Sequence, residues 1–199
     1  YGKILESITK TQNSNTMVAV LLHDINRFKV INDSLGHAFG DKILCALAKR
    51  FENLVKENDT VARMGGDEFV VLLTGVANED EVSHAAREFL KRVAEPLQLD
   101  GREITVATSM GISLYPRDRQ VPESLIRFSD IAMYKAKNEG GNSFCFYSPE
   151  MNKRAIETLE LESALRKSLE TGEFFLLYQP KVDLMSGRVI GCEALVRWH

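Results

Sequence analysis

The strongest apolar pattern in the chain lies at residues 16–24, where apolar side chains occupy both faces and the run ends in an aspartate. This pattern is typical of a central strand that other elements cover on both faces. From residue 27 the apolar spacing becomes helical, breaks around Gly36 and Gly40, and resumes over residues 41–54. The pattern therefore predicts a buried strand followed by two helices that a glycine-containing turn connects.

The middle of the chain alternates strand-like and helical segments. Strand-like runs at residues 60–64 and 67–73 flank Gly65 and Gly66, which permit positive φ, and this arrangement predicts a hairpin. The elements predicted after it are a helix capped by Asn78 and ending near residue 94, a hairpin of strands 97–99 and 103–114, a helix from Pro122 to about residue 140, and a short strand at 144–147. We therefore expect an α+β domain whose mostly antiparallel central sheet is flanked by helices.

The last part of the chain predicts a long helix and a second hairpin. Ser148 is suited to cap a helix that starts at Pro149, and the helical spacing continues to about Gly172. Strand-like segments at 173–184 and 189–198 flank a short turn, and such a hairpin has no core of its own. We expect three parts, namely a domain over residues 1–147, a connector helix over 148–172 and an incomplete domain over 173–199.

Composition narrows the possible functions. The 199 residues are 44% hydrophobic and 27% charged, with a formal net charge of -3, as in an ordinary globular protein. Without a basic excess, nucleic acid and anionic lipid are not expected partners, and any phosphate site must be local. The apolar runs are too short to cross a bilayer, and no signal peptide is recognisable. We expect a cytoplasmic fragment cut at both ends from a longer protein, whose missing N-terminal region leaves room for a sensor or a membrane anchor.

The cysteines and one histidine lack the spacing of a metal or redox site. Cys45, Cys145 and Cys192 lie far apart without a CxxC pair, so we expect reduced cysteines in the core. His23 directly precedes Asp24, but alternation along a strand points the two side chains to opposite faces. This arrangement favours a packing role for His23 over metal binding.

The residues that suggest chemistry form one short turn, Gly65-Gly66-Asp67-Glu68. Two glycines allow backbone to approach an anion beside metal-binding carboxylates, although an exposed acidic hairpin tip would have the same sequence. Asp24 favours the first interpretation, because a carboxylate that ends an apolar strand needs a metal ion or another partner. Alternation along a regular strand would send Asp67 and Glu68 to opposite faces, so we expect different roles for them.

Several motifs together resemble the GGDEF family in order and spacing. They are Asp24-Ile25-Asn26-Arg27-Phe28-Lys29, Ile31-Asn32-Asp33-Ser34-Leu35-Gly36-His37, Gly40-Asp41, Ala62-Arg63-Met64-Gly65-Gly66-Asp67-Glu68-Phe69 and Met133-Tyr134-Lys135-Ala136-Lys137. The resemblance covers about residues 1–147. It implies a palm-like fold with a ferredoxin-like core, related to nucleotide cyclases and polymerases. The implied activity is that of a diguanylate cyclase, which condenses two GTP molecules into cyclic di-GMP and releases pyrophosphate.

The resemblance also implies cofactors and a homodimer. Two Mg²⁺ or Mn²⁺ ions per active site would be held by Asp24, the carbonyl of Ile25, Asp67 and Glu68, and both metals accept oxygen ligands of this kind. In the family, the residue equivalent to Asp67 is linked to metal binding and to activation of the attacking 3′-hydroxyl. Each domain of the family binds one GTP, so the new bond forms between two half-sites and catalysis needs a homodimer.

The other contacts implied by the resemblance concern GTP itself. These residues are Phe28, Lys29, Asn32, Asp41, Gly65, Gly66 and Lys137. Asn32 and Asp41 would bind the guanine edge, where a carboxylate accepts hydrogen bonds that adenine cannot donate. Lys29 and Lys137 would neutralise phosphate groups. Without the motif, Asp41 would be an acid favoured at a helix N-terminus, and the lysines would be solvated surface charges.

The sequence departs from the family pattern near the phosphate and inhibitory positions. Gly141 stands where the family usually has an arginine, four residues after the phosphate lysine, and Asn26 replaces a frequent aspartate. Lys56 and Asp59 form a degenerate version of the product-inhibition site, because lysine lacks the bidentate fork of arginine. We therefore expect weaker GTP binding or turnover, and weak or absent feedback inhibition by cyclic di-GMP. Arg63, beside the hairpin, is expected in a buried ion pair rather than at a phosphate.

The C-terminal segment resembles the opening of an EAL cyclic di-GMP phosphodiesterase domain. The motifs are Tyr178-Gln179-Pro180-Lys181-Val182-Asp183-Leu184 and Gly191-Cys192-Glu193-Ala194-Leu195-Val196-Arg197-Trp198. Glu193 would be a metal ligand in the full-length domain. Because the rest of that domain is absent, we expect no hydrolytic activity from this part of the fragment.

Three functions stay open at this point. The first is an active diguanylate cyclase, which the full set of metal and base positions supports. The second is a GTP-binding regulatory module of the attached phosphodiesterase, which the change at Gly141 makes plausible. The third is a structural or protein-interaction domain, and the intact signature argues against it.

Overall fold

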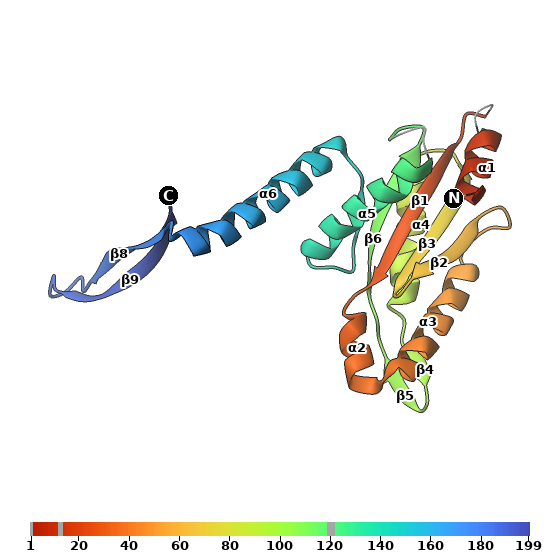
Figure 1. Cartoon of the computed structure of the whole chain (residues 1–199). Coiled ribbons are helices and arrows are strands. Elements are labelled where there is room, and N and C mark those ends of the chain that lie inside the picture. The colour runs from red at the N-terminus through yellow and green to blue at the C-terminus, as the bar shows by residue number, and fades with distance from the viewer. Residues whose placement is uncertain (1, 12–13, 119–121) are drawn as a thin grey trace. The chain divides into compact units, whose positions relative to one another are not determined.

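The computed structural model describes residues 2–11, 14–118 and 122–199. Its elements are α1 (Gly2–Thr11), β1 (Met17–Ile25), α2 (Phe28–Leu35), α3 (His37–Glu52), β2 (Thr60–Gly65), β3 (Glu68–Val76), α4 (Glu79–Val93), β4 (Leu97–Leu99), β5 (Arg102–Ile104), β6 (Thr108–Tyr115), α5 (Pro122–Asn138), β7 (Phe144–Phe146), α6 (Pro149–Thr171), β8 (Phe174–Val182) and β9 (Val189–Trp198). The chain forms two compact units, Tyr1–Met151 and Asn152–His199 (Figure 1).

A five-stranded sheet in the order β2-β3-β1-β6-β7 forms the centre of the first unit. All neighbouring strands are antiparallel except β6 and β7, which are parallel. The doubly apolar segment predicted as a central strand is β1, and it lies between β3 and β6. The expectation of an α+β fold with a mostly antiparallel sheet and flanking helices is confirmed.

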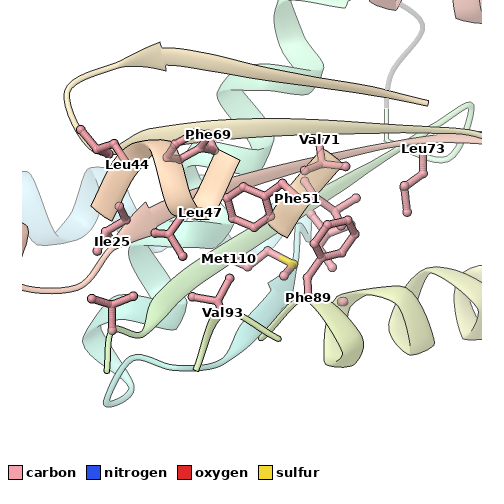
Figure 2. Packing of buried hydrophobic residues seen from close by; sticks show 14 of the residues in the cluster. Ile25, Leu44, Leu47, Phe51, Phe69, Val71, Leu73, Phe89, Val93 and Met110 are labelled. Carbon is pink, nitrogen blue, oxygen red and sulfur yellow. The ribbon is translucent and has the colours of Figure 1, made fainter. Parts of the chain in front are cut away.

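The two faces of β1 contribute to different parts of the core. Ala19, Leu21 and Ile25 join the larger cluster, which packs against residues of α3 and α4. Figure 2 shows how Phe51 of α3 and Phe89 of α4 fill the space beneath the sheet in this cluster. The side chains on the other face are Val18, Val20 and Leu22, which pack with residues of α1 and α5. Coverage on both faces explains why the whole strand is apolar.

Helix α5 packs unusually close to the sheet at Gly111 of β6. A Cβ atom at Gly111 would overlap the carbonyl oxygen of Ser129 and the backbone of Met133. The hydroxyl of Ser129 also lies 2.9 Å from the hydroxyl of Ser113 in β6. It donates a 3.1 Å hydrogen bond to the carbonyl oxygen of Val20 in β1. These contacts fix α5 over β1 and β6 and therefore determine where its C-terminal residues lie.

Two boundaries differ from the sequence-based expectation. Gly40 does not interrupt the helical region, because α3 already begins at His37 and Gly40 lies in its first turn. The strand expected at 103–114 is split into β5, which pairs with β4, and β6, which pairs with β1. The two halves of this apolar segment therefore form strands in two different sheets.

The expectation that the cysteines are reduced agrees with the structure, but their expected place in the core is wrong for two of them. All three are free, Cys45 and Cys192 are exposed, and Cys145 is partly buried. Cys45 lies next to the buried Leu44 on α3, and the helical rotation turns it outward.

The second unit consists mainly of α6 and the antiparallel hairpin of β8 and β9. The carboxylate of Glu173 connects the two, because it accepts hydrogen bonds from Ser168 of α6 and from the indole of Trp198. The predicted boundaries at residues 148 and 173 remain predictions. Within the described residues, no helix is long and apolar enough to span a membrane.

Candidate functional site

The end of β1 places a carboxylate at the edge of the central sheet. Asp24 belongs to the same face as Val20 and Leu22, and it is only 7% exposed. Its Oδ1 lies 2.7 Å from Nζ of Lys137 in α5. The sequence predicts that this carboxylate needs a partner, and in the structure that partner is Lys137.

The glycine turn brings the two signature carboxylates to the same place. Glu68 is the first residue of β3 and lies directly opposite Asp24 in the strand register. Asp67 lies in the turn, where its carbonyl oxygen accepts a long hydrogen bond of 3.4 Å from the backbone N–H of Ile25. Gly66 has a φ of 54°, which glycine adopts without strain. The turn is therefore tied to the end of β1.

Asp67 and Glu68 do not follow each other along a regular strand, contrary to the expectation of strand alternation. Asp67 precedes β3, so the period-two rule does not apply to it. Burial and the nearby Asp24 carboxylate raise the pKa of Asp67. Burial, Asp130 and Asp24 raise the pKa of Glu68 in the same direction. Both signature carboxylates thus lie in the electrostatic field of Asp24.

Arg63 binds the backbone of the signature turn. Its Nε and Nη2 donate hydrogen bonds of 2.9 and 2.6 Å to the carbonyl oxygen of Gly66. The expectation of a buried ion pair is wrong, because Arg63 is exposed at the edge strand β2 and binds a backbone carbonyl. This arginine therefore restrains the conformation of the signature turn.

The predicted base-contact residues lie on α2 and in the N-terminal half of α3. Phe28 and Asn32 lie on α2, and Gly40 lies on α3. The two helices pack closely here, because a Cβ atom built on Gly40 would overlap Oδ1 of Asn32 and lie 3.1 Å from Cζ of Phe28. Oδ1 of Asn32 is buried without a hydrogen-bond partner within the described structure. Asp41, the next residue, is exposed and lines a cavity of about 300 Å³. Buried acceptors without hydrogen-bond partners are uncommon, so a ligand that donates a hydrogen bond to Oδ1 of Asn32 would be stabilised.

The other predicted residues are exposed or have contacts of their own. Lys29 is exposed on α2. Lys56 pairs with Glu81 at 3.2 Å, whereas Asp59 accepts hydrogen bonds from the backbone N–H groups of Lys56 and Thr74. Glu193 is exposed on β9, where Lys181 lies 3.9 Å from it.

The carboxylates at the edge of the sheet are of a ligand type that suits a divalent cation. Asp24, Asp67 and Glu68 offer oxygen ligands only, which Mg²⁺ and Mn²⁺ prefer. Their mutual repulsion is the kind of imbalance that a cation would relieve. Across residues 2–11, 14–118 and 122–199, however, no three His, Cys, Asp or Glu side chains are already arranged as a metal site. Lys137 pairs with Oδ1 of Asp24 in this structure, beside the position that a cation would take.

Two further groups near this edge have surroundings that the sequence did not predict. Asp130 of α5 has a raised pKa because of burial and the nearby Asp24 carboxylate. Its spacing of seven residues from Lys137 places both on one helix face, and this spacing was the available signal. Asn26 is the second group, since its Oδ1 accepts a 2.8 Å hydrogen bond from Ser109, 83 residues away in sequence. No local pattern predicts that contact.

His23 has the packing role that the sequence predicts. It is fully buried, and its ring centroid lies 4.8 Å from that of Phe51 and 5.6 Å from that of Phe89. Neither ring nitrogen has a hydrogen-bond partner among the described residues, and burial lowers its pKa to about 3. The ring is therefore neutral at physiological pH and takes no part in the carboxylate site.

Comparison with known proteins identifies the families that the two parts of the chain match. Residues 2–143 match the model of the family described as diguanylate cyclase, GGDEF domain, and residues 162–199 match part of the EAL domain model. The bifunctional diguanylate cyclase/cyclic di-GMP phosphodiesterase MucR of Pseudomonas aeruginosa is 40% identical over 99% of this chain and 29% of its own length. The cyclic di-GMP phosphodiesterase NbdA of the same species is 38% identical over 92% of this chain and 23% of its own.

Solved structures show the same fold. The crystal structure of the GGDEF domain of YfiN from Pseudomonas aeruginosa superposes with a TM-score of 0.72 and 36% identity, covering 74% of this chain and 92% of that one. The chain spans less than a third of the curated relatives MucR and NbdA. The chain therefore belongs to the diguanylate cyclase GGDEF-domain family, and the beginning of an EAL domain follows its GGDEF domain.

Proposed function

We propose that this GGDEF domain condenses two GTP molecules into cyclic di-GMP and pyrophosphate. The observation that supports this proposal most strongly is the meeting of Asp24, Asp67 and Glu68 at one edge of the sheet, with Lys137 beside them. Carboxylates and an ammonium group at one site suit a reaction in which a triphosphate is held while an oxygen attacks phosphorus.

The roles of the residues follow from their chemistry. Bound at Asp24, Ile25, Asp67 and Glu68, Mg²⁺ or Mn²⁺ would polarise the α-phosphate and make the 3′-hydroxyl more acidic. Asp67 is placed in a turn whose backbone is held to Ile25, so its carboxylate can accept the proton of that hydroxyl. Lys137 pairs with Asp24 and carries the charge to bind a phosphate oxygen.

The base contacts would select guanine. Among the described residues, Oδ1 of Asn32 has no hydrogen-bond partner, and Asp41 follows Gly40, which packs against Asn32, so both can accept hydrogen bonds from the guanine edge. Adenine offers no matching pair of donors, and an acceptor left unpaired penalises the wrong base. Phe28 closes the apolar side of this region against Gly40.

The proposal requires two copies of the chain. One domain holds one GTP, and each 3′-hydroxyl must attack the α-phosphate of the other nucleotide, so the reaction takes place between two half-sites. The rate per chain should therefore rise with protein concentration until dimerisation is complete.

A second candidate is a GTP-binding module that regulates the attached EAL domain. Gly141 removes a charged donor at the phosphate end, and one of the relatives, NbdA, is named as a phosphodiesterase alone. In this case the domain would bind GTP and change shape or association without forming product.

One experiment separates these candidates. The chain and an Asp67→Ala variant are incubated with GTP and Mg²⁺, the nucleotides are resolved by chromatography, and GTP binding is measured by calorimetry. Cyclic di-GMP from the unmodified chain alone supports the cyclase. GTP binding without product supports the regulatory module, and neither binding nor product contradicts both.

A further inference from the structure

Asn26 and Gly141, two positions at which the sequence departs from the family pattern, lie in contact. Asn26 follows β1, and its backbone N–H donates a 2.8 Å hydrogen bond to the carbonyl oxygen of Ala107. Gly141 lies beyond α5, and a Cβ atom built on it would be 2.7 Å from Nδ2 of Asn26 and 3.4 Å from Oγ of Ser109. A Cβ contact of 2.7 Å does not occur without movement, so the Asn26 carboxamide occupies the space that any side chain at position 141 would need.

The orientation of this carboxamide is fixed from its other end. Ser109 donates a 2.8 Å hydrogen bond to Oδ1 of Asn26, which leaves Nδ2 directed toward Gly141. Gly141 has a φ of 68° and uses its own N–H to bond the carbonyl oxygen of Ala136. A larger residue at 141 would therefore face both backbone strain and the Asn26 amide.

The amide brings a donor to the place where the family has an arginine. Within the described structure, no residue accepts a hydrogen bond from Nδ2 of Asn26, and Lys137 lies near the end of α5, four residues before Gly141 in sequence. We infer that the Asn26 amide replaces the missing arginine as the second donor to the triphosphate of GTP, with Lys137 as the first, an inference that rests on the proposed function. The two departures are then a single coupled change, in which a neutral donor on β1 takes the place of a charged donor after α5.

The contact itself can be tested without nucleotide. We compare the thermal unfolding midpoints of Gly141→Ala in the unmodified chain and in an Asn26→Ala background, with Gly140→Ala as the matched control. Gly140 also has a positive φ, of 115°, but an added Cβ there meets nothing within 4 Å. Gly141→Ala should lower the midpoint by about 4 °C or more in the unmodified chain and by clearly less when Asn26 is alanine. The effect of Gly140→Ala should be the same in both backgrounds, and equal shifts for Gly141→Ala would overturn the contact.

The role of the amide is tested by binding. In Mg²⁺ buffer, Asn26→Ala should weaken GTP binding about tenfold and leave guanosine binding unchanged within about twofold, since guanosine has no phosphate. Asn26→Asp keeps the acceptor for Ser109 but removes the donor, so it should weaken GTP binding at least as much. The control is Asn138→Ala, an exposed asparagine on α5 that should bind GTP normally. Unchanged GTP affinity in Asn26→Ala would overturn the inference while leaving the proposed function intact, whereas an unmodified chain that binds no GTP would contradict both.

Discussion

Lys137 and Asp24 form an ion pair, with Nζ 2.7 Å from Oδ1, although 113 residues separate them in sequence. The pair joins the C-terminal end of α5 to the end of β1, next to the signature turn. It gives the buried carboxylate of Asp24 a cationic partner. The pair therefore stabilises the fold at the same position where the proposed chemistry takes place.

Removing the lysine should destabilise the domain. The side chain of Asp24 is 10% exposed and that of Lys137 is 45% exposed, so the pair is partly screened by water. We expect Lys137→Met to lower the free energy of unfolding by about 1–2 kcal/mol at pH 7, less than for a fully buried pair. Urea unfolding measures this loss, with Lys137→Arg as a control that keeps the charge. The same loss in an Asp24→Asn background would show that the effect does not come from the ion pair.

Gly111 should be among the least replaceable residues of the fold. A methyl group there would overlap the backbone of Ser129 and Met133, and α5 would have to move away from β6. Overpacking of this kind costs about 3 kcal/mol when backbone must shift. Urea unfolding of Gly111→Ala should show this loss. Gly191→Ala, where an added Cβ meets nothing within 4 Å, should change stability by less than about 0.5 kcal/mol.

His23 should make the domain less stable in acid. Its pKa falls from 6.5 to about 3 on burial, so below pH 6.5 the unfolded chain binds a proton that the folded chain does not. Stability is therefore complete above pH 6.5 and decreases as the pH falls toward 3, by up to about 1.4 kcal/mol per pH unit. Unfolding is followed by urea in buffer with a chelator, for the unmodified chain and for His23→Leu. Parallel pH profiles for the two proteins would refute this assignment.

Feedback inhibition by cyclic di-GMP should be weak or absent. Lys56 provides a single point charge that already pairs with Glu81, and both carboxylate oxygens of Asp59 accept backbone hydrogen bonds. We expect no inhibition of GTP turnover by low micromolar cyclic di-GMP. Lys56→Arg restores the bidentate fork and should introduce measurable inhibition. Strong inhibition of the unmodified chain would contradict the prediction.

The sequence predicts most of the secondary structure because its patterns are local. Residues of β1 are apolar on both faces because two layers cover the strand, and Asn78 caps α4 through a hydrogen bond from the N–H of Glu81. The split of the run at 103–114 was missed, since nothing in an apolar pattern shows which partner strand each half will choose.

The sequence predicts which residues form the candidate site, but it does not predict the contacts between them. Motif spacing identified Asp24 and Lys137, yet their contact depends on the close packing of α5 at Gly111, which no local pattern reveals. The prediction for Arg63 was wrong because strand β2 lies at the edge of the sheet, where its side chains are exposed. Contacts between distant segments, such as Ser109 with Asn26, follow only from the assembled sheet.

We propose above all that the carboxylates at the end of β1 and the start of β3 carry the synthesis of cyclic di-GMP. The most direct test is the initial rate of cyclic di-GMP formation from GTP and Mg²⁺, for the unmodified chain, for Glu68→Gln and for Glu139→Gln. Glu139 is an exposed carboxylate that pairs with Lys135 on α5, and it serves as the matched control. We predict product from the unmodified chain and from Glu139→Gln, and a rate at least about a hundredfold lower for Glu68→Gln. Equal rates for all three proteins, or no product from the unmodified chain at concentrations where it is dimeric, would contradict the claim.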